Sequence, residues 1–135
     1  MSHDPLLFSR CEKSVAAATV SLEEAKQSVA HLVKQEGRIS TELLEEQQFA
    51  AHGLAWMATY VAALDTLLDW ARKLDRDGEF RQLESLLLKI AFGEYLSQIR
   101  GGIAISQVEI LRPVDMGLSA EQESPISTEI GRAHV

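Results

Sequence analysis

The stretch that decides the fold is residues 49–71, FAAHGLAWMATYVAALDTLLDWA. Its apolar residues recur at steps of three and four, the spacing of one face of an α-helix. One stripe consists of Ala50, Leu54, Met57, Val61, Leu64, Leu68 and Ala71, and a second consists of His52, Trp56, Tyr60, Ala63, Leu67, Trp70 and Leu74. A helix with apolar residues on most sides needs neighbours on most sides. We therefore predict that the helix over residues 41–76 lies centrally in the fold.

A second long helix is predicted upstream, over residues 5–36. Asp4 before Pro5 is a typical helix start, and Gly37 is a typical stop. Ser40 is expected to cap the central helix after a short reversal. The apolar face of this upstream helix is predicted to comprise Cys11, Val15, Ala18, Leu22, Ala25, Val29 and Leu32.

A third helix is predicted from about Glu79, after a turn at Gly78, to the glycine pair Gly101-Gly102. We expect Phe80, Leu83, Leu87 and Ile90 to form its main stripe. Further apolar residues join that stripe, namely Leu86, Leu88, Ala91, Phe92, Tyr95, Leu96 and Ile99. Residues 103–111 are either a short helix or an extended segment, and Arg112-Pro113 ends either one.

The fold class that follows is all-α, an antiparallel up-and-down bundle of three long helices plus a short C-terminal segment. Residues 1–112 are expected to form the helical module. Residues 113–135 change to a composition rich in Ser, Glu, Gly and Pro, and we expect a loose tail in which Met116 and Leu118 are the last anchors.

Composition excludes several classes of function. The chain has 135 residues with 13 Lys plus Arg against 20 Asp plus Glu, a formal charge of −7, so one acidic domain is expected and nucleic acid is not a partner. The single Cys11 has no partner for a disulfide within the chain, which fits a reducing cytoplasm. Its place on an apolar helix face predicts a core residue. The apolar part of residues 46–65 is too short and too polar for a membrane span.

Catalytic motifs are not visible in this sequence. A carboxylate-bridged metal bundle needs Glu three residues before His, and neither His31 nor His52 has it. There is no nucleophile elbow, P-loop or dinucleotide fingerprint. We therefore assign no catalytic, cofactor-binding or metal-binding residue, and we interpret His52 as a histidine at the edge of the core and His31 as a surface residue.

Two polar residues lie in apolar surroundings near the end of the third helix, Glu94 and Gln98. A buried carboxylate needs a partner. We expect Glu94 to find Arg100, Arg112, a backbone amide or water as its partner, in a structural network that closes this end of the bundle.

Three blocks of sequence carry a resemblance to a known family: residues 49–61, residues 92–96 (FGEYL) and residues 101–113 (GGIAISQVEILRP). Over about residues 38–118 the chain resembles the N-terminal extension of methylsuccinyl-CoA dehydrogenase-like proteins, within the flavin-dependent acyl-CoA dehydrogenase family. Ala104, Val108 and Leu111 depart from the usual pattern of that extension, which leaves the acyl substrate open.

The resemblance implies a parent protein that removes two hydrogens across the α and β carbons of a short branched acyl-CoA such as methylsuccinyl-CoA, using FAD and a glutamate base. It also implies that the catalytic domains follow this extension. We therefore expect the catalytic domains of the parent chain and a homo-oligomer as partners, and no FAD on this piece itself.

A second resemblance involves Gln98-Ile-Arg-Gly101-Gly102, which is similar to a Q-x-x-G-G segment in the C-terminal bundle of acyl-CoA dehydrogenases. In that family the glycines allow the backbone to approach the diphosphate of the cofactor. Here we interpret them as a plain helix C-cap.

The last six residues, Ile130-Gly-Arg-Ala-His-Val135, match a translated sequencing adapter. We expect a truncated gene, with residues 113–135 as a linker toward absent catalytic domains. The alternative is a stand-alone helical module that forms homodimers. A third class, a small-ligand binder with a pocket between His52, Trp56 and Glu94, stays open.

Overall fold

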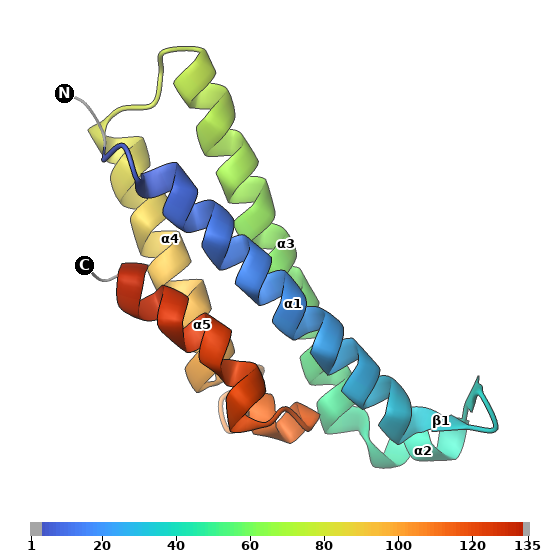
Figure 1. The fold of residues 1–135 in the computed structure, drawn as a ribbon. Coiled ribbons are helices and arrows are strands. Elements are labelled where there is room, and N and C mark those ends of the chain that lie inside the picture. The colour runs from blue at the N-terminus through green and yellow to red at the C-terminus, as the bar shows by residue number, and fades with distance from the viewer. Residues whose placement is uncertain (1–3, 134–135) are drawn as a thin grey trace.

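The computed structural model describes residues 4–133, and most of them are helical (Figure 1). The helices are α1 (Leu7–Val33), α2 (Thr41–Glu46), α3 (Gln48–Arg76), α4 (Gln82–Gly101) and α5 (Ala120–Ala133), with a 3₁₀ turn, η1, at Pro113–Met116. Two short antiparallel strand pairs join them, β1 (Lys34–Gln35) with β2 (Arg38–Ile39) and β3 (Ile103–Ala104) with β4 (Ile110–Leu111). The all-α class is confirmed.

The long helices run alternately up and down (Figure 1). α1 packs mainly on α3 and α5, α4 packs on the same two helices, and α1 and α4 lie diagonally across the bundle. The predicted three-helix bundle therefore needs correction, because α5 completes a fourth side. Within the described residues, no helix is both long and apolar enough to cross a membrane.

The expectation of a loose tail from Pro113 onward was wrong. Ser119 and Gln122 form a reciprocal cap at the start of α5: the Ser119 amide donates to Gln122 Oε1 at 2.9 Å, and the Gln122 amide donates to Ser119 Oγ at 3.3 Å. Ile126 is then buried, as are the predicted anchors Met116 and Leu118. The proposed adapter residues 130–135 lie outside the described side chains, although the backbone of α5 continues to Ala133.

α1 presents a narrow row of small residues to the core. Between Cys11 and Val29 the buried positions are Ser14, Ala18, Ser21 and Ala25, at steps of three and four. The predicted residues Val15, Leu22 and Leu32 lie at the edge of this face or outside it. The Ser14 hydroxyl donates to the Arg10 carbonyl at 2.9 Å, so this buried polar group is satisfied.

The reversal after α1 is a two-residue hairpin. Lys34 pairs with Ile39 and Gln35 with Arg38, and both turn residues have positive φ, 51° at Glu36 and 77° at Gly37. Ser40 then caps α2, accepting from the Leu43 amide at 3.3 Å, as predicted. The central helix expected over residues 41–76 is interrupted at Gln47, which separates α2 from α3.

The core face of α3 agrees with the first predicted stripe, because Ala50, Met57, Val61, Leu64, Leu68 and Ala71 are all buried. The main stripe predicted for the third helix was wrong except at Phe80, which is buried just before α4 begins. The residues buried on this helix are Ser85, Leu88, Phe92, Leu96 and Ile99. Leu83, Leu87 and Ile90 instead point away from the bundle.

Residues 103–111 are extended, one of the two forms left open by the sequence. Ile103 pairs with Leu111 and Ala104 with Ile110. Leu111 packs so closely over Gly53 of α3 that a Cβ at position 53 would overlap the leucine methyl groups. This contact attaches the hairpin to the central helix.

Candidate docking surface

The outward side of α4 is an uncovered apolar face formed by Leu83, Leu86, Leu87 and Ile90, which we call the α4 outer face. Their exposed fractions are 63%, 48%, 49% and 61%, respectively. Several large apolar side chains with such high exposed fractions on one helix are typical of a surface that another molecule or domain covers.

The α4 outer face is open because of the way α4 sits in the bundle. Leu88 and Phe92 point to the core, while α3 and α5 take the two flanks, so the remaining side has no neighbour among residues 4–133. In Figure 1 α4 forms one edge of the bundle. The stripe does not continue along the helix, because the next two positions on this side are Glu94 and Ser97, both exposed.

The second predicted stripe of α3 forms a row of aromatic contacts toward α4. Trp56 Nε1 donates to His52 Nε2 at 3.0 Å, and Trp56 meets Tyr60 edge to face with ring centroids 6.4 Å apart. Tyr60 then contacts Tyr95 of α4 at 4.7 Å. Trp56 and Tyr60 are partly buried, whereas Trp70 remains 37% exposed, so the bundle covers this stripe incompletely.

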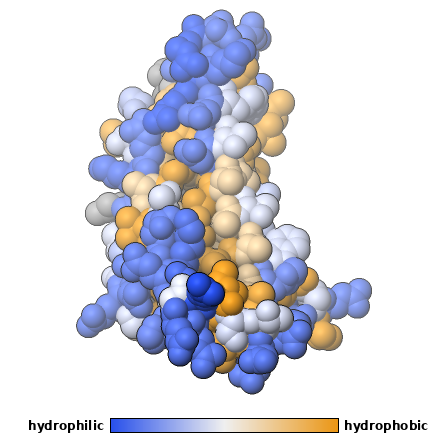
Figure 2. Space-filling model, turned by 90° about the vertical axis from the view of Figure 1, so that its right-hand side faces the viewer, coloured by the Kyte–Doolittle hydropathy of each residue, from blue (hydrophilic) through white to orange (hydrophobic). Residues whose placement is uncertain are grey.

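The broad side of the bundle that lies at the right of Figure 1 is shown in Figure 2. Apolar residues gather in a band along this face, and hydrophilic residues border the band. An ion pair also joins α3 to α1, in which Arg72 reaches Glu12 at 2.6 Å. The hydrogen bond to Glu12 raises the pKa of Arg72, because it favours the charged guanidinium.

Cys11 lies in the core, as predicted. Burial raises the pKa of its thiol to about 12, with a smaller contribution from the neighbouring Glu12 carboxylate. A thiol of this kind is not a nucleophile at neutral pH. His31 is exposed, as expected, and His52 lies at the surface with its ring bonded to Trp56.

Glu94 does not take part in the predicted network. Its side chain is exposed on the outward side of α4, so it needs no buried partner, and the expectation of a pair with Arg100 or Arg112 is corrected. Gln98 does make a polar contact with α3, because its Oε1 accepts a hydrogen bond from the Tyr60 hydroxyl at 2.7 Å. The ligand pocket considered between His52, Trp56 and Glu94 gains no support from an outward-facing Glu94.

The glycine pair at the end of α4 acts as a helix cap. Gly102 has a φ of 139°, and its amide donates to the Gln98 carbonyl at 2.8 Å. A Cβ at position 102 would overlap the Ile110 side chain. This contact holds the β3–β4 hairpin against the end of α4.

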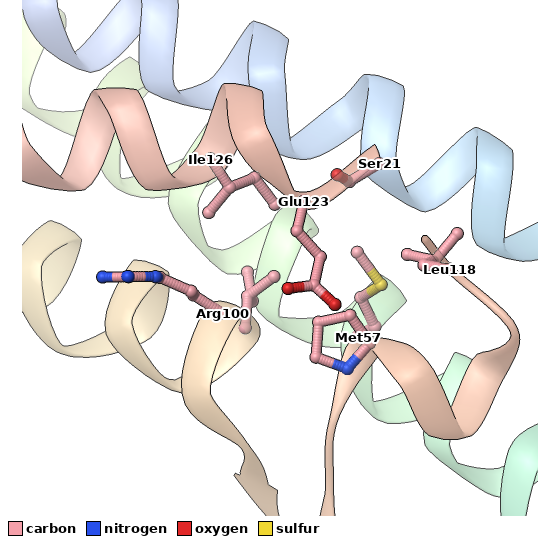
Figure 3. Close-up of a pocket in the computed structure, with 8 residues that line it drawn as sticks. Ser21, Met57, Arg100, Leu118, Glu123 and Ile126 are labelled. Atoms are coloured by element: carbon pink, nitrogen blue, oxygen red, sulfur yellow. The ribbon is translucent and has the colours of Figure 1, made fainter. Parts of the chain in front are cut away.

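A gap between α1, α3, α4 and α5 is lined by Ser21, Met57, Ile99 and Ile126, among others (Figure 3). The Glu123 carboxylate projects among these side chains, while the Arg100 side chain extends away from it (Figure 3). The gap leaves no space even for a water molecule. Among the described residues no group of three or more His, Cys, Asp or Glu side chains could hold a metal ion.

A smaller apolar projection lies at the tip of the β3–β4 hairpin. Val108 is 90% exposed, and the turn that carries it is held by Ser106, whose Oγ accepts from the amides of Val108 and Glu109 at 3.3 and 3.1 Å. The sequence did not single out this tip. Its only signal was an apolar residue between the polar residues Gln107 and Glu109.

The sequence shows apolar residues on several sides of this helix, but it did not separate the α4 outer face from the core face. The signal was present, since the stripe through Leu83, Leu87 and Ile90 turns polar at Glu94, whereas the stripe through Leu88, Phe92 and Ile99 stays apolar to the end of the helix. The geometry as a whole defines a helical bundle with an apolar face that no other part of residues 4–133 covers.

The sequence comparison then gives a particular relative. The chain is 49% identical over 96 residues to (2S)-methylsuccinyl-CoA dehydrogenase of Cereibacter sphaeroides. The match covers 71% of this chain but only 18% of that protein. The resemblance predicted from the three sequence blocks is confirmed. No protein-family model matches the chain.

Proposed function

We propose that this chain is the non-catalytic, helical N-terminal part of an FAD-dependent oxidoreductase similar to acyl-CoA dehydrogenases. The observation that carries the proposal is the 49% identity to (2S)-methylsuccinyl-CoA dehydrogenase, which extends over 71% of this chain and only 18% of the relative. The uncovered α4 outer face supports it, because a module of a larger protein keeps an apolar surface for its neighbouring domains.

In the intact protein, the catalytic domains would oxidise a short branched acyl-CoA such as methylsuccinyl-CoA. FAD would supply the acceptor for the two hydrogens removed from the substrate. In this proposal the catalytic base and the cofactor site belong to those catalytic domains, and the covered Gly102 and the exposed Glu94 of this chain support that assignment. The intact protein would be a cytoplasmic homo-oligomer.

The test begins with the genomic DNA beyond codon 128. An open reading frame that continues into flavin-dependent catalytic domains allows expression of the full-length protein beside the 135-residue chain. We expect the full-length protein to be yellow and to reduce an artificial electron acceptor with methylsuccinyl-CoA, and we expect the 135-residue chain to be colourless. A reading frame that ends at Val135, or flavin bound to the short chain, would contradict the proposal.

The α4 outer face also favours one alternative, a stand-alone module that pairs with a second copy through this face. Light scattering of the 135-residue chain separates the two. A well-folded, monodisperse dimer favours the stand-alone module, whereas concentration-dependent aggregation favours a module separated from its catalytic domains.

A further inference from the structure

We infer that the α4 outer face receives an amphipathic helix from the remaining part of the same polypeptide. This inference rests on the proposed function and goes beyond it by assigning the face and the chemistry of its occupant. The supporting observation is a row of exposed leucine and isoleucine side chains on a helix whose other sides already pack against the bundle.

The spacing of the side chains on the α4 outer face fits contact with a second helix. Leu83, Leu86, Leu87 and Ile90 stand at positions i, i+3, i+4 and i+7, so they form one stripe across two turns. Stripes of this kind form the ridges and grooves that pack against a second helix. The long helices of the bundle already pack against one another through such stripes, for example Leu88, Phe92 and Ile99 on the opposite side of α4.

The backbone of α4 rules out the other common form of peptide docking. Apart from the groups at its two ends, α4 (Gln82–Gly101) uses its backbone amides and carbonyls within the helix, so this face offers no edge to which a strand could be added. Contact must therefore be made through side chains. The polar end of the stripe, at Glu94 and Ser97, limits the apolar contact to the N-terminal half of α4.

The length of the relative favours an occupant from the same polypeptide over a second copy. The matched 96 residues make up 18% of the dehydrogenase, so most of that protein lies outside the part matched here. A segment linked covalently to the module has a high effective concentration near it, and it competes well against a separate molecule.

The experiment uses the full-length protein, with a photo-cross-linking amino acid in place of Leu87. The control carries the same amino acid in place of Val20 on α1, which is 53% exposed and thus comparable with Leu87 at 49%. We expect position 87 to cross-link within one chain to the apolar face of a helix of the catalytic part. We expect position 20 not to do so.

Three outcomes would overturn the inference: cross-links from position 87 between two copies, no cross-link from position 87, or equal cross-linking from position 20. The flavin content and the activity of the same samples are measured in parallel. If the protein carries flavin and oxidises its substrate while position 87 remains unlinked, this inference fails and the proposed function stands. If the full-length protein has no flavin and no activity, the proposed function fails.

A substitution gives a second readout. Leu87→Asp in the full-length protein places a charge in the buried contact, and we expect the helical module to be released by limited proteolysis at least about tenfold faster than from the unsubstituted protein. Val20→Asp is the matched control and should leave the rate unchanged. Equal rates for Leu87→Asp and the unsubstituted protein would contradict an occupied α4 outer face.

Discussion

The hydroxyl of Tyr60 on α3 donates a 2.7 Å hydrogen bond to Oε1 of Gln98 on α4. The two residues are 38 positions apart, and the same tyrosine ring contacts Tyr95 of α4. Burial raises the pKa of Tyr60, so the hydroxyl stays a donor well into the alkaline range. This pair is a direct polar link between α3 and α4 beside the buried face of α4.

Removing the hydroxyl of Tyr60 should weaken the bundle. Tyr60→Phe is expected to lower the free energy of unfolding by about 1 kcal/mol, the usual value for one partly buried hydrogen bond. Gln98→Met should have a similar effect. In urea denaturation the double variant should lose less than the sum of the two single losses, and strict additivity would show that the two groups do not interact.

The stability of the chain should fall at high pH because of Cys11. Its pKa is raised from 9.0 to about 12 by burial, so the unfolded chain releases this proton first as the pH rises. The contribution of the thiol is fully present below pH 9.0 and is lost toward about pH 12. Denaturation between pH 8 and pH 12 should show a steeper decline for the native chain than for Cys11→Ala. Parallel curves would contradict it.

Gly53→Ala tests the contact between α3 and the β3–β4 hairpin. The new methyl group would overlap Leu111, which costs about 1–3 kcal/mol, while the gain in helix propensity is about 1 kcal/mol. We expect a net loss in thermal unfolding. In a Leu111→Ala background the same substitution should become neutral or stabilising. Gly101→Ala is the matched control, because no atom lies within 4 Å of its added Cβ.

Adjacent leucines on α4 should lose very different amounts of stability on the same substitution. Leu88 is fully buried, and Leu88→Gln is expected to cost about 3 kcal/mol or more. Leu87 is 49% exposed, and Leu87→Gln should change stability by less than about 0.5 kcal/mol while reducing the binding of an apolar fluorescent dye. Similar losses for both variants would show that α4 is rotated differently.

The central helix was the most predictable part of the fold. Its first stripe is apolar along the whole of α3, so one spacing decides its core face, and the burial of Met57, Leu64 and Leu68 follows that spacing. The interruption at Gln47 was not predictable in the same way. Ser40 caps the start of the helix, and helix-forming residues then continue without a break past Gln47, where α2 ends.

α4 and α5 were harder to predict for different reasons. α4 has apolar residues on several sides, so two stripes compete, and only the position of its neighbours decides between Leu87 and Leu88. In α5 the composition was misleading, because Pro125 and the surrounding serines are typical of loops. The local signal lay in Ser119 and Gln122, a spacing typical of a helix start.

The row of small residues on α1 lets this helix pack closely against both α3 and α5. Ser21 lies beside Met57 of α3 and Ile126 of α5, so one hydroxymethyl group borders two helices at once. A bulkier residue there would press on both neighbours at once. The C-terminal helix and the central helix should therefore melt together, as a single cooperative unit.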